Sequence, residues 1–351
     1  MSIIINLLLF ILILGVIVFV HEFGHFIFAK WNGVYVYEFA LGMGPKICGF
    51  KKGETEYNLR AIPIGGFCQL AGEDLESDKE VKIPKNMQLQ NKKAWQRFLI
   101  MLFGPMNNFI LAVILLFFIA LIWGGSTMKP VVTEIEKDSA AYKVGMKENI
   151  TVVKINGKKV ETSDDISLYL AIANPKKGAT FVVKDKNNKK YTYKVKPKKV
   201  KEDGKETYRY GIGIKQKKTN GLGNAFIYTY KKTKSIFKQM FITVGYLFTG
   251  KISLSQLSGP VGIYSVVGQQ RSAGLANILY LMAFLSINVG FINLLPIPAF
   301  DGGHILFIII EKIKGSPIKP EIENKIHTVF LILLMLLMVV ITFNDILRLF
   351  K

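Results

Sequence analysis

The sequence predicts a polytopic α-helical membrane protein with four transmembrane helices, and three observations support this. Half of the 351 residues are hydrophobic, and the mean hydropathy is +0.30. Four apolar stretches each come close to or exceed the ~20 residues that a helix needs to cross a hydrocarbon core. Polar, lysine-rich segments separate them, which indicates domains outside the membrane. The apolar stretches are residues 2–20, 98–123, 276–310 and 329–347.

The first apolar stretch is predicted to be a retained helix rather than a signal peptide. No basic residues precede it, and no small-residue cleavage site follows it. We therefore expect the first transmembrane helix within residues 1–29 and the second at 98–123. A third transmembrane segment is expected at 276–310 and a fourth helix at 326–348.

The segments between these helices have different patterns. Residues 30–97 contain paired glycines and a short alternating run, which predict a membrane-associated β-hairpin structure. Alternating apolar residues in 128–221 predict a soluble α+β domain. In 222–275, aromatic residues interleave with lysines, which favours a helix lying on the membrane surface and then a linker. The apolar part at 237–248 leaves a fifth span as the alternative.

The formal net charge of +21 raises the question of a nucleic-acid partner. No zinc-finger, helix-turn-helix or RNA-binding signature accompanies the lysines, so we expect none. Anionic head groups attract basic segments by about 1 kcal/mol per Lys or Arg near the surface, so membrane lipids are the expected partners.

The distribution of basic residues predicts the topology in a cell inner or plasma membrane. Segment 30–97 and the short last loop, with Lys312 and Lys314, are basic, whereas no Lys or Arg precedes the first helix. Both loops are therefore expected in the cytoplasm. The 128–221 domain and both termini are then extracytoplasmic, since long domains translocate largely regardless of charge.

A metal-binding motif, H-E-x-x-H, continues the first apolar stretch as His21, Glu22 and His25. Residues four apart share one face of a helix, so both imidazoles can bind one Zn²⁺ while Glu22 acts as general base. Ionisable residues in an apolar segment are costly and are normally functional. The motif therefore predicts a catalytic zinc site.

Asp301 is the best candidate for the third ligand that a catalytic zinc needs. It lies in residues 293–304, where prolines and glycines interrupt an apolar segment, and broken backbone at membrane depth normally lines a protein-enclosed cavity. The H-E-x-x-H motif and Asp301 are both expected near the cytoplasmic ends of their apolar segments, as a shared metal requires. Nearby His304 could be a fourth ligand, a residue that supports Asp301, or a solvated helix end.

Together, the H-E-x-x-H motif and the N-x-L-P-I-P-x-x-D-G-G-H segment at 293–304 resemble the site-2 protease family of intramembrane zinc metalloproteases, peptidase family M50. The arrangement is most similar to the bacterial RseP/RasP-type branch. The resemblance implies that His21, His25 and Asp301 bind zinc and that Glu22 is the catalytic base. Further matching segments are residues 42–45, 62–67, 71–73 and 257–263.

The resemblance also implies substrate-binding residues. The family's cytoplasmic hairpin is thought to pair with an unwound substrate helix, which points to Gly65, Gly66 and Phe67, with ordinary turn chemistry as the alternative for the glycines. Asn293 matches a position linked to substrate handling. Alternatively, its amide satisfies carbonyls that the nearby prolines leave free.

Residues 128–221 resemble one PDZ domain, through the segments 129–132, 139–141, 145–146 and 155–157. The usual Ser-Pro-Ala is replaced by Ser-Ala-Ala at 139–141, and Glu148-Asn149 replaces the usual Gly-Asp. A PDZ-like fold is expected, while peptide binding by its groove stays open.

The function implied by the resemblance is regulated intramembrane proteolysis. The substrates would be single-span transmembrane proteins of the anti-sigma factor or remnant signal peptide type, already cut once by another protease. The PDZ-like domain would exclude substrates with bulky ectodomains. Two other hypotheses are a membrane scaffold that holds clients and a metal transporter. Against them stand Glu22, which has no structural use in a scaffold, and the absence of an inverted repeat.

Overall fold

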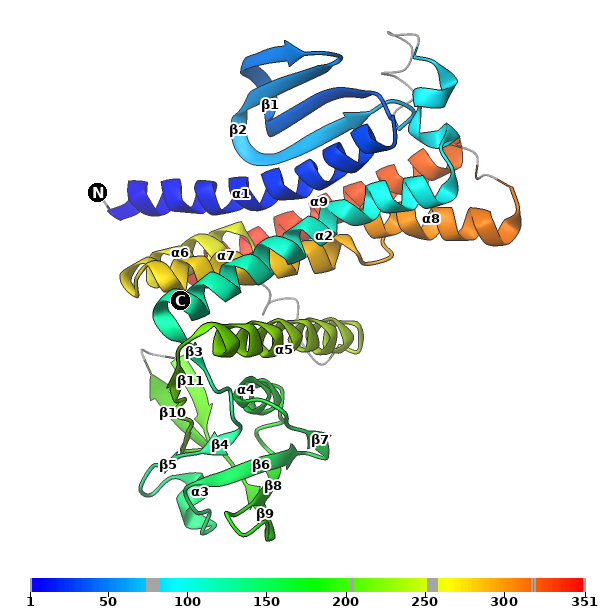
Figure 1. Ribbon diagram of the computed structural model, residues 1–351. Coiled ribbons are helices and arrows are strands. Elements are labelled where there is room, and N and C mark those ends of the chain that lie inside the picture. Colours follow the sequence, from blue (N-terminus) through cyan, green and yellow to red (C-terminus); the bar gives the residue numbers. More distant parts are fainter. Residues whose placement is uncertain are drawn as a thin grey trace. The chain divides into compact units, whose positions relative to one another are not determined.

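The chain forms two compact units in the computed structural model (Figure 1), which describes residues 2–73, 83–202, 205–250, 258–316, 318 and 320–349. Residues 1–116 and 253–351 make up the first unit and residues 117–252 the second. Leu257, the first residue of the matching segment 257–263, lies outside the described residues.

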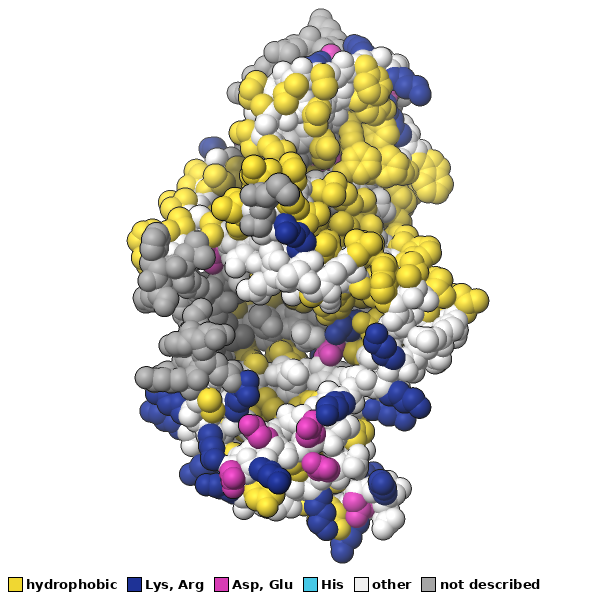
Figure 2. All heavy atoms as spheres, turned by 90° about the vertical axis from the view of Figure 1, so that its left-hand side faces the viewer, with side chains coloured by type: hydrophobic (Ala, Val, Ile, Leu, Met, Phe, Trp, Pro, Cys, Tyr) yellow, Lys and Arg dark blue, Asp and Glu magenta, His cyan; other side chains and the backbone are white. Residues whose placement is uncertain are grey.

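Four helices of the described chain are long and apolar enough to cross a membrane, which confirms the predicted number. Their apolar side chains remain largely exposed, as expected of helices that face lipid, and Figure 2 shows apolar side chains over much of the visible face of the first unit. These helices are α1 (Ser2–Trp31), α2 (Ala94–Ile119), α7 (Leu275–Asn293) and α9 (Pro320–Leu349).

The third apolar segment is broken, as its prolines and glycines indicate. α7 ends at Asn293, and a new helix, α8 (Asp301–Lys314), begins after seven irregular residues, 294–300. Short turns bridge the break, because the Ile297 amide donates to the Leu295 carbonyl and the Phe300 amide to the Ile297 carbonyl. The freed carbonyl of Pro298 accepts a 2.8 Å hydrogen bond from His327 Nδ1 on α9.

A β-sheet follows α1 and is larger than the hairpin that the sequence indicates. It consists of β1 (Val36–Lys52) and β2 (Thr55–Leu70), two long, irregular strands. Residues 36–41 pair with 66–70 on one side and with 56–59 on the other, and 46–52 pair with 55–60. The short helices Lys85–Met87 and Leu89–Asn91 then lead to α2.

The predicted linker before the third segment contains a helix, α6 (Pro260–Ser272), that the sequence did not indicate. The amides of Gly259 and Gly262 at its start both donate 2.8 Å hydrogen bonds to Asp345 Oδ2 on α9. Its buried residue Val267 packs with Phe10 and Ile17 of α1. α6 therefore belongs to the helical core of the first unit.

The second unit is a mixed α+β domain whose core includes Val132, Ile155, Ile166 and Phe181. Strands β4, β6, β8 and β9 follow one another in its main sheet, with β7 beside β6. Three further strand pairs are β5–β12, β3–β13 and β10–β11. The strands are β3 (Gly125–Ser126), β4 (Val131–Val132), β5 (Glu134–Ile135), β6 (Ile150–Ile155), β7 (Lys158–Lys159), β8 (Ala179–Lys184), β9 (Lys190–Val195), β10 (Lys198–Glu202), β11 (Lys205–Arg209), β12 (Ile212–Gly213) and β13 (Lys218–Thr219).

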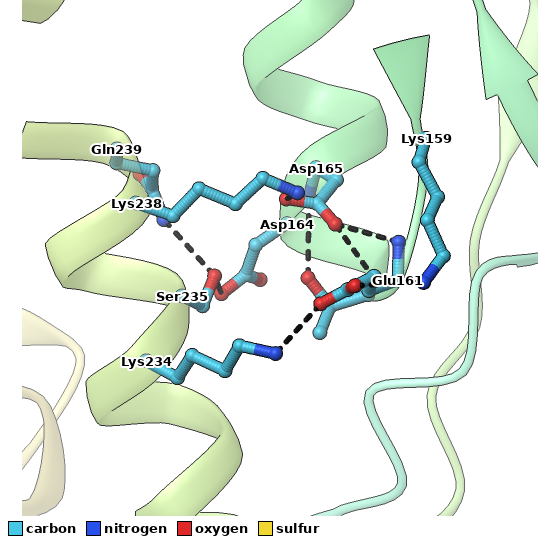
Figure 3. Close-up of polar contacts among 9 residues, drawn as sticks. Lys159, Glu161, Asp164, Asp165, Lys234, Ser235, Lys238 and Gln239 are labelled. Carbon is cyan, nitrogen blue, oxygen red and sulfur yellow. Dashed lines mark hydrogen bonds and ion pairs between the residues drawn. The ribbon is translucent and has the colours of Figure 1, made fainter. Parts of the chain in front are cut away.

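Helices of the second unit are α3 (Ala140–Lys143), α4 (Ser163–Ala171), α5 (Leu222–Phe248) and a π-helical turn at Ala120–Gly124. Ion pairs join α5 to the start of α4: Lys238 with Asp165, and Lys234 with Glu161 (Figure 3). The hydrogen bond from Lys234 helps hold the pKa of Glu161 at about 2, below its usual value. Among the described helices, α5 is not one of the four candidate spans.

Candidate metal centre

The H-E-x-x-H motif lies inside α1, which continues to Trp31, and helical periodicity brings its two histidines together. His21 and His25 are both buried, at 8% and 7% exposure, and their Nε2 atoms lie 3.3 Å apart. Both imidazoles therefore present the same nitrogen to one point beside the helix.

Asp301, the first residue of α8, faces that same point. Its Oδ2 lies 3.2 Å from His21 Nε2, and its Oδ1 lies 3.3 Å from His25 Nε2. Two glycines set this position, because a Cβ on Gly302 would be 2.3 Å from the Leu295 carbonyl oxygen and one on Gly303 2.5 Å from that of Ile297. The start of α8 thus packs directly against the broken backbone before it.

Helix α2 orients both imidazoles through contacts with their Nδ1 atoms. His25 Nδ1 donates a 2.9 Å hydrogen bond to the Ile100 carbonyl, which leaves the Nε2 lone pair free for a ligand. His21 Nδ1 lies 3.4 Å from the side-chain amide nitrogen of Asn108. The close approach depends on Gly104, since a Cβ there would be 2.1 Å from His25 Nε2.

These residues fit a zinc ion. One ligand atom from each of His21, His25 and Asp301 lies within 4.8 Å of the other two, the only such group of three or more His, Cys, Asp or Glu within the described ranges. Two imidazoles and a carboxylate form a catalytic zinc set with an open position. In the part of the chain that the structure describes, Asp301 Oδ2 is buried without a hydrogen-bond donor, as a carboxylate awaiting a cation would be.

A cavity of about 340 Å³ opens in front of the three ligand atoms. Glu22 lines it together with His21, His25 and Asp301, so the four residues that the sequence predicts share one space. Of the remaining lining residues, only Phe67 was predicted from the sequence. They are Phe67, Cys68, Gln69 and Leu70 of β2, Glu73 after it, and Met101 of α2.

The other candidate residues are less central. Gly65 and Gly66 lie in β2 beside Phe67, but neither lines the cavity, and Asn293 ends α7 outside it. His304 is not in the ligand group of the described residues, and its Nδ1 lies 3.1 Å from Glu323 Oε1. His327 of α9 helps hold the break before Asp301 through its hydrogen bond to the Pro298 carbonyl.

The sequence contains only weak signals for the cavity-lining residues and for Asn108, which were not predicted. Cys68 to Leu70 continue the alternating strand that contains Phe67, so the strand could have been extended to them. Burial raises the pKa of the Cys68 thiol, so it stays protonated at neutral pH. Met101 and Asn108 lie in an apolar helix whose pattern does not reveal which face meets the metal.

Comparison with known proteins decides the family, because the family model described as peptidase family M50 matches residues 9–337. The chain belongs to that family. The M50 chain is 35% identical to the Regulator of sigma-W protease RasP of Bacillus subtilis, over 97% of this chain and 98% of the relative. It is 34% identical to the Zinc metalloprotease RasP of Bacillus licheniformis, over 97% and 98%.

This M50 protein is therefore an intramembrane zinc metalloprotease with several membrane-spanning helices, and Zn²⁺ is its cofactor. The predicted family and enzyme class are confirmed. The scaffold and transporter hypotheses are set aside, because the curated relatives are named as proteases.

Proposed function

We propose that His21, His25 and Asp301 bind the catalytic zinc and that Glu22 is the general base. The observation that carries this is the convergence of both Nε2 atoms on the Asp301 carboxylate, at 3.2 and 3.3 Å. When bound, zinc supplies Lewis acidity to the scissile carbonyl and to the attacking water. Glu22, in the same cavity, takes the proton from that water and passes it to the leaving amine.

The decisive variant is Glu22→Gln, which keeps the shape of the side chain but removes the base. In nanodiscs with a tagged single-span substrate, we expect normal zinc content and cleavage slowed at least about 100-fold. His21→Ala should instead lose zinc, while Glu56→Gln, at a partly exposed glutamate of the sheet that does not line the metal cavity, should change neither quantity. Cleavage by Glu22→Gln at the wild-type rate would refute the mechanism.

The proposed substrates are single-span membrane proteins of the anti-sigma factor or remnant signal peptide type, already shortened by another protease. The name of the Bacillus subtilis relative, a regulator of sigma-W, supports this class. The active site would lie near the cytoplasmic side, with both termini and the 128–221 domain on the other side.

The edge of the β-sheet at residues 66–70 is the proposed docking strand for the substrate. In the register of the described residues, 66–70 pair with 36–41, which places them at one edge of the sheet. Phe67 and the next three residues line the cavity beside the ligand atoms. A substrate segment added to this edge would satisfy its opened backbone and pass in front of the metal. Gly65, Gly66 and Asn293 would border that path.

A crosslinking experiment separates this edge from the opposite one. A photoreactive phenylalanine is placed at Phe67 or, as a matched control, at exposed Phe50 in the strand 46–52 at the other edge. We expect the substrate to crosslink at position 67 and not at 50 in a Glu22→Gln background. Equal crosslinking at both positions would contradict docking at this edge.

The domain at 128–221 is proposed to be PDZ-like and to act as a size filter. α5, with exposed Phe226, Tyr230 and Phe241, is proposed to lie on the membrane surface. Its ion pairs with the start of α4 support a single module made of the domain and this helix. Deleting residues 128–221 should permit cleavage of a full-length substrate, and unchanged rejection would remove the filter role.

A further inference from the structure

Asn108 on α2 is a fully buried amide in the membrane-spanning core, at 0% exposure. Its Nδ2 lies 3.4 Å from His21 Nδ1. Among the residues that the structure describes, its Oδ1 has no hydrogen-bond partner. Its own backbone carbonyl accepts a 2.8 Å hydrogen bond from Ser286 Oγ on α7, which helps hold this turn of α2 in place.

The two nitrogens of His21 face different partners. Nε2 points to Asp301 Oδ2 at 3.2 Å, so a metal shared with Asp301 takes this nitrogen. The proton of the neutral ring then sits on Nδ1, which must donate to an acceptor. For His25 the Ile100 carbonyl is that acceptor, at 2.9 Å. His21 has Asn108 in the corresponding place.

An amide can serve both tautomers of His21, because a half-turn about its last side-chain bond exchanges oxygen and nitrogen. Before zinc binds, Nδ2 donates to Nδ1, so the proton of the neutral His21 ring sits on Nε2, which lies 3.2 Å from Asp301 Oδ2. After zinc binds, Oδ1 accepts the proton of Nδ1. A carboxylate could only accept the Nδ1 proton and could not donate to Nδ1, and it would add a charge at membrane depth.

We propose that Asn108 is a positioning residue for His21, whose side-chain oxygen accepts the Nδ1 proton when zinc occupies Nε2. This rests on the proposed zinc ligands. The acceptors for the two Nδ1 protons, the Ile100 carbonyl and Asn108 Oδ1, then both lie on α2, about two turns apart. Outer partners of this kind typically contribute about 10–100-fold in metal affinity.

The test is zinc affinity, measured by competition with a chelator on the full-length protein in nanodiscs. Asn108→Leu removes the acceptor at similar volume, and Asn108→Asp restores an acceptor. Asn107→Leu is the matched control, because Asn107 also reaches α1, donating to the Val20 carbonyl at 3.3 Å, and within the described part of the chain it has no hydrogen bond to His21, His25 or Asp301. His21→Ala reports on the ligand assignment itself.

We expect Asn108→Leu to weaken zinc binding about 10–100-fold, with Asn108→Asp close to wild type and Asn107→Leu unchanged. With Co²⁺ in place of Zn²⁺, Asn108→Leu should also shift the visible absorption bands. Equal affinity of Asn108→Leu and Asn107→Leu would overturn the proposal, as would an Asn108→Asp variant as weak as Asn108→Leu. If Asn108→Leu fails to fold, Asn108→Ala replaces it. Should His21→Ala retain zinc, the ligand set itself would be wrong.

Discussion

Gly104 lies so close to His25 that a Cβ on residue 104 would be 2.1 Å from His25 Nε2. Helix α2 therefore touches the very atom that is proposed to bind zinc. Gly24 makes the reciprocal approach from α1, where a Cβ would be 2.1 Å from the Phe103 carbonyl oxygen. The two glycines set the spacing of α1 and α2 at the metal.

Replacing Gly104 with Ala should displace His25 or push the two helices apart. We expect a loss of zinc affinity larger than that of Asn108→Leu, and little cleavage at low zinc concentration. Gly15→Ala is the control, since a Cβ at Gly15 of α1 meets nothing within 4 Å of the described atoms. Zinc titration of both variants is the measurement, and equal affinities would show that α1 and α2 can separate without cost.

Removal of the metal should abolish cleavage reversibly. After treatment with a chelator, wild-type protein should recover its rate when stoichiometric zinc is returned, because its ligand residues remain in place. Asp301→Ala should recover only at much higher zinc, since two imidazoles alone leave the site one ligand short. A normal recovery curve for Asp301→Ala would remove Asp301 from the ligand set.

Asp345 should stabilise the first unit by holding the start of α6. At 3% exposure, its Oδ2 accepts both the Gly259 and Gly262 amides. Asp345→Leu leaves the buried Gly259 amide and the partly buried Gly262 amide without that acceptor, and a buried unsatisfied group costs about 1–3 kcal/mol. We expect a lower thermal unfolding midpoint, a smaller change for Asp345→Asn and almost none for Asn344→Leu. Identical midpoints for Asp345→Leu and wild type would contradict this role.

The ion pairs of Glu161 predict a pH dependence for the second unit. The folded-state pKa of Glu161, about 2, lies below its ordinary value of 4.5, so its stabilising effect is present above pH 4.5. The effect is lost as the pH falls from 4.5 towards 2. The difference in unfolding midpoint between wild type and Glu161→Gln should shrink over that range. Glu136→Gln, an exposed glutamate of the same unit, should show no such change.

Much of the membrane architecture could be predicted because long apolar runs have few alternatives to spanning helices. The four helices and the break before Asp301 follow from composition, prolines and glycines alone. α6 could not be predicted in this way. It contains Gly262 and Gly268 among mixed polar residues, and its place depends on Asp345, which lies far away in the sequence.

The residues of the candidate site also divide into those that the sequence could predict and those that it could not. His21, Glu22 and His25 are close in sequence, so helical geometry suffices to bring them together, and Asp301 stands out in an interrupted apolar segment. Asn108 and Met101 sit in a nearly uniform apolar helix, where no periodicity marks the face towards the metal. Only the packing of α2 against α1, governed by Gly24 and Gly104, shows which residues meet the ligands.

The distance along the chain between His25 and Asp301 has a consequence for biosynthesis. The ribosome makes α1 long before α8, so the proposed ligand set stays incomplete until α8 has been made. A truncated product that lacks α8 carries the H-E-x-x-H motif without its carboxylate partner. Such fragments should be catalytically silent, which protects neighbouring membrane proteins from cleavage by unfinished chains.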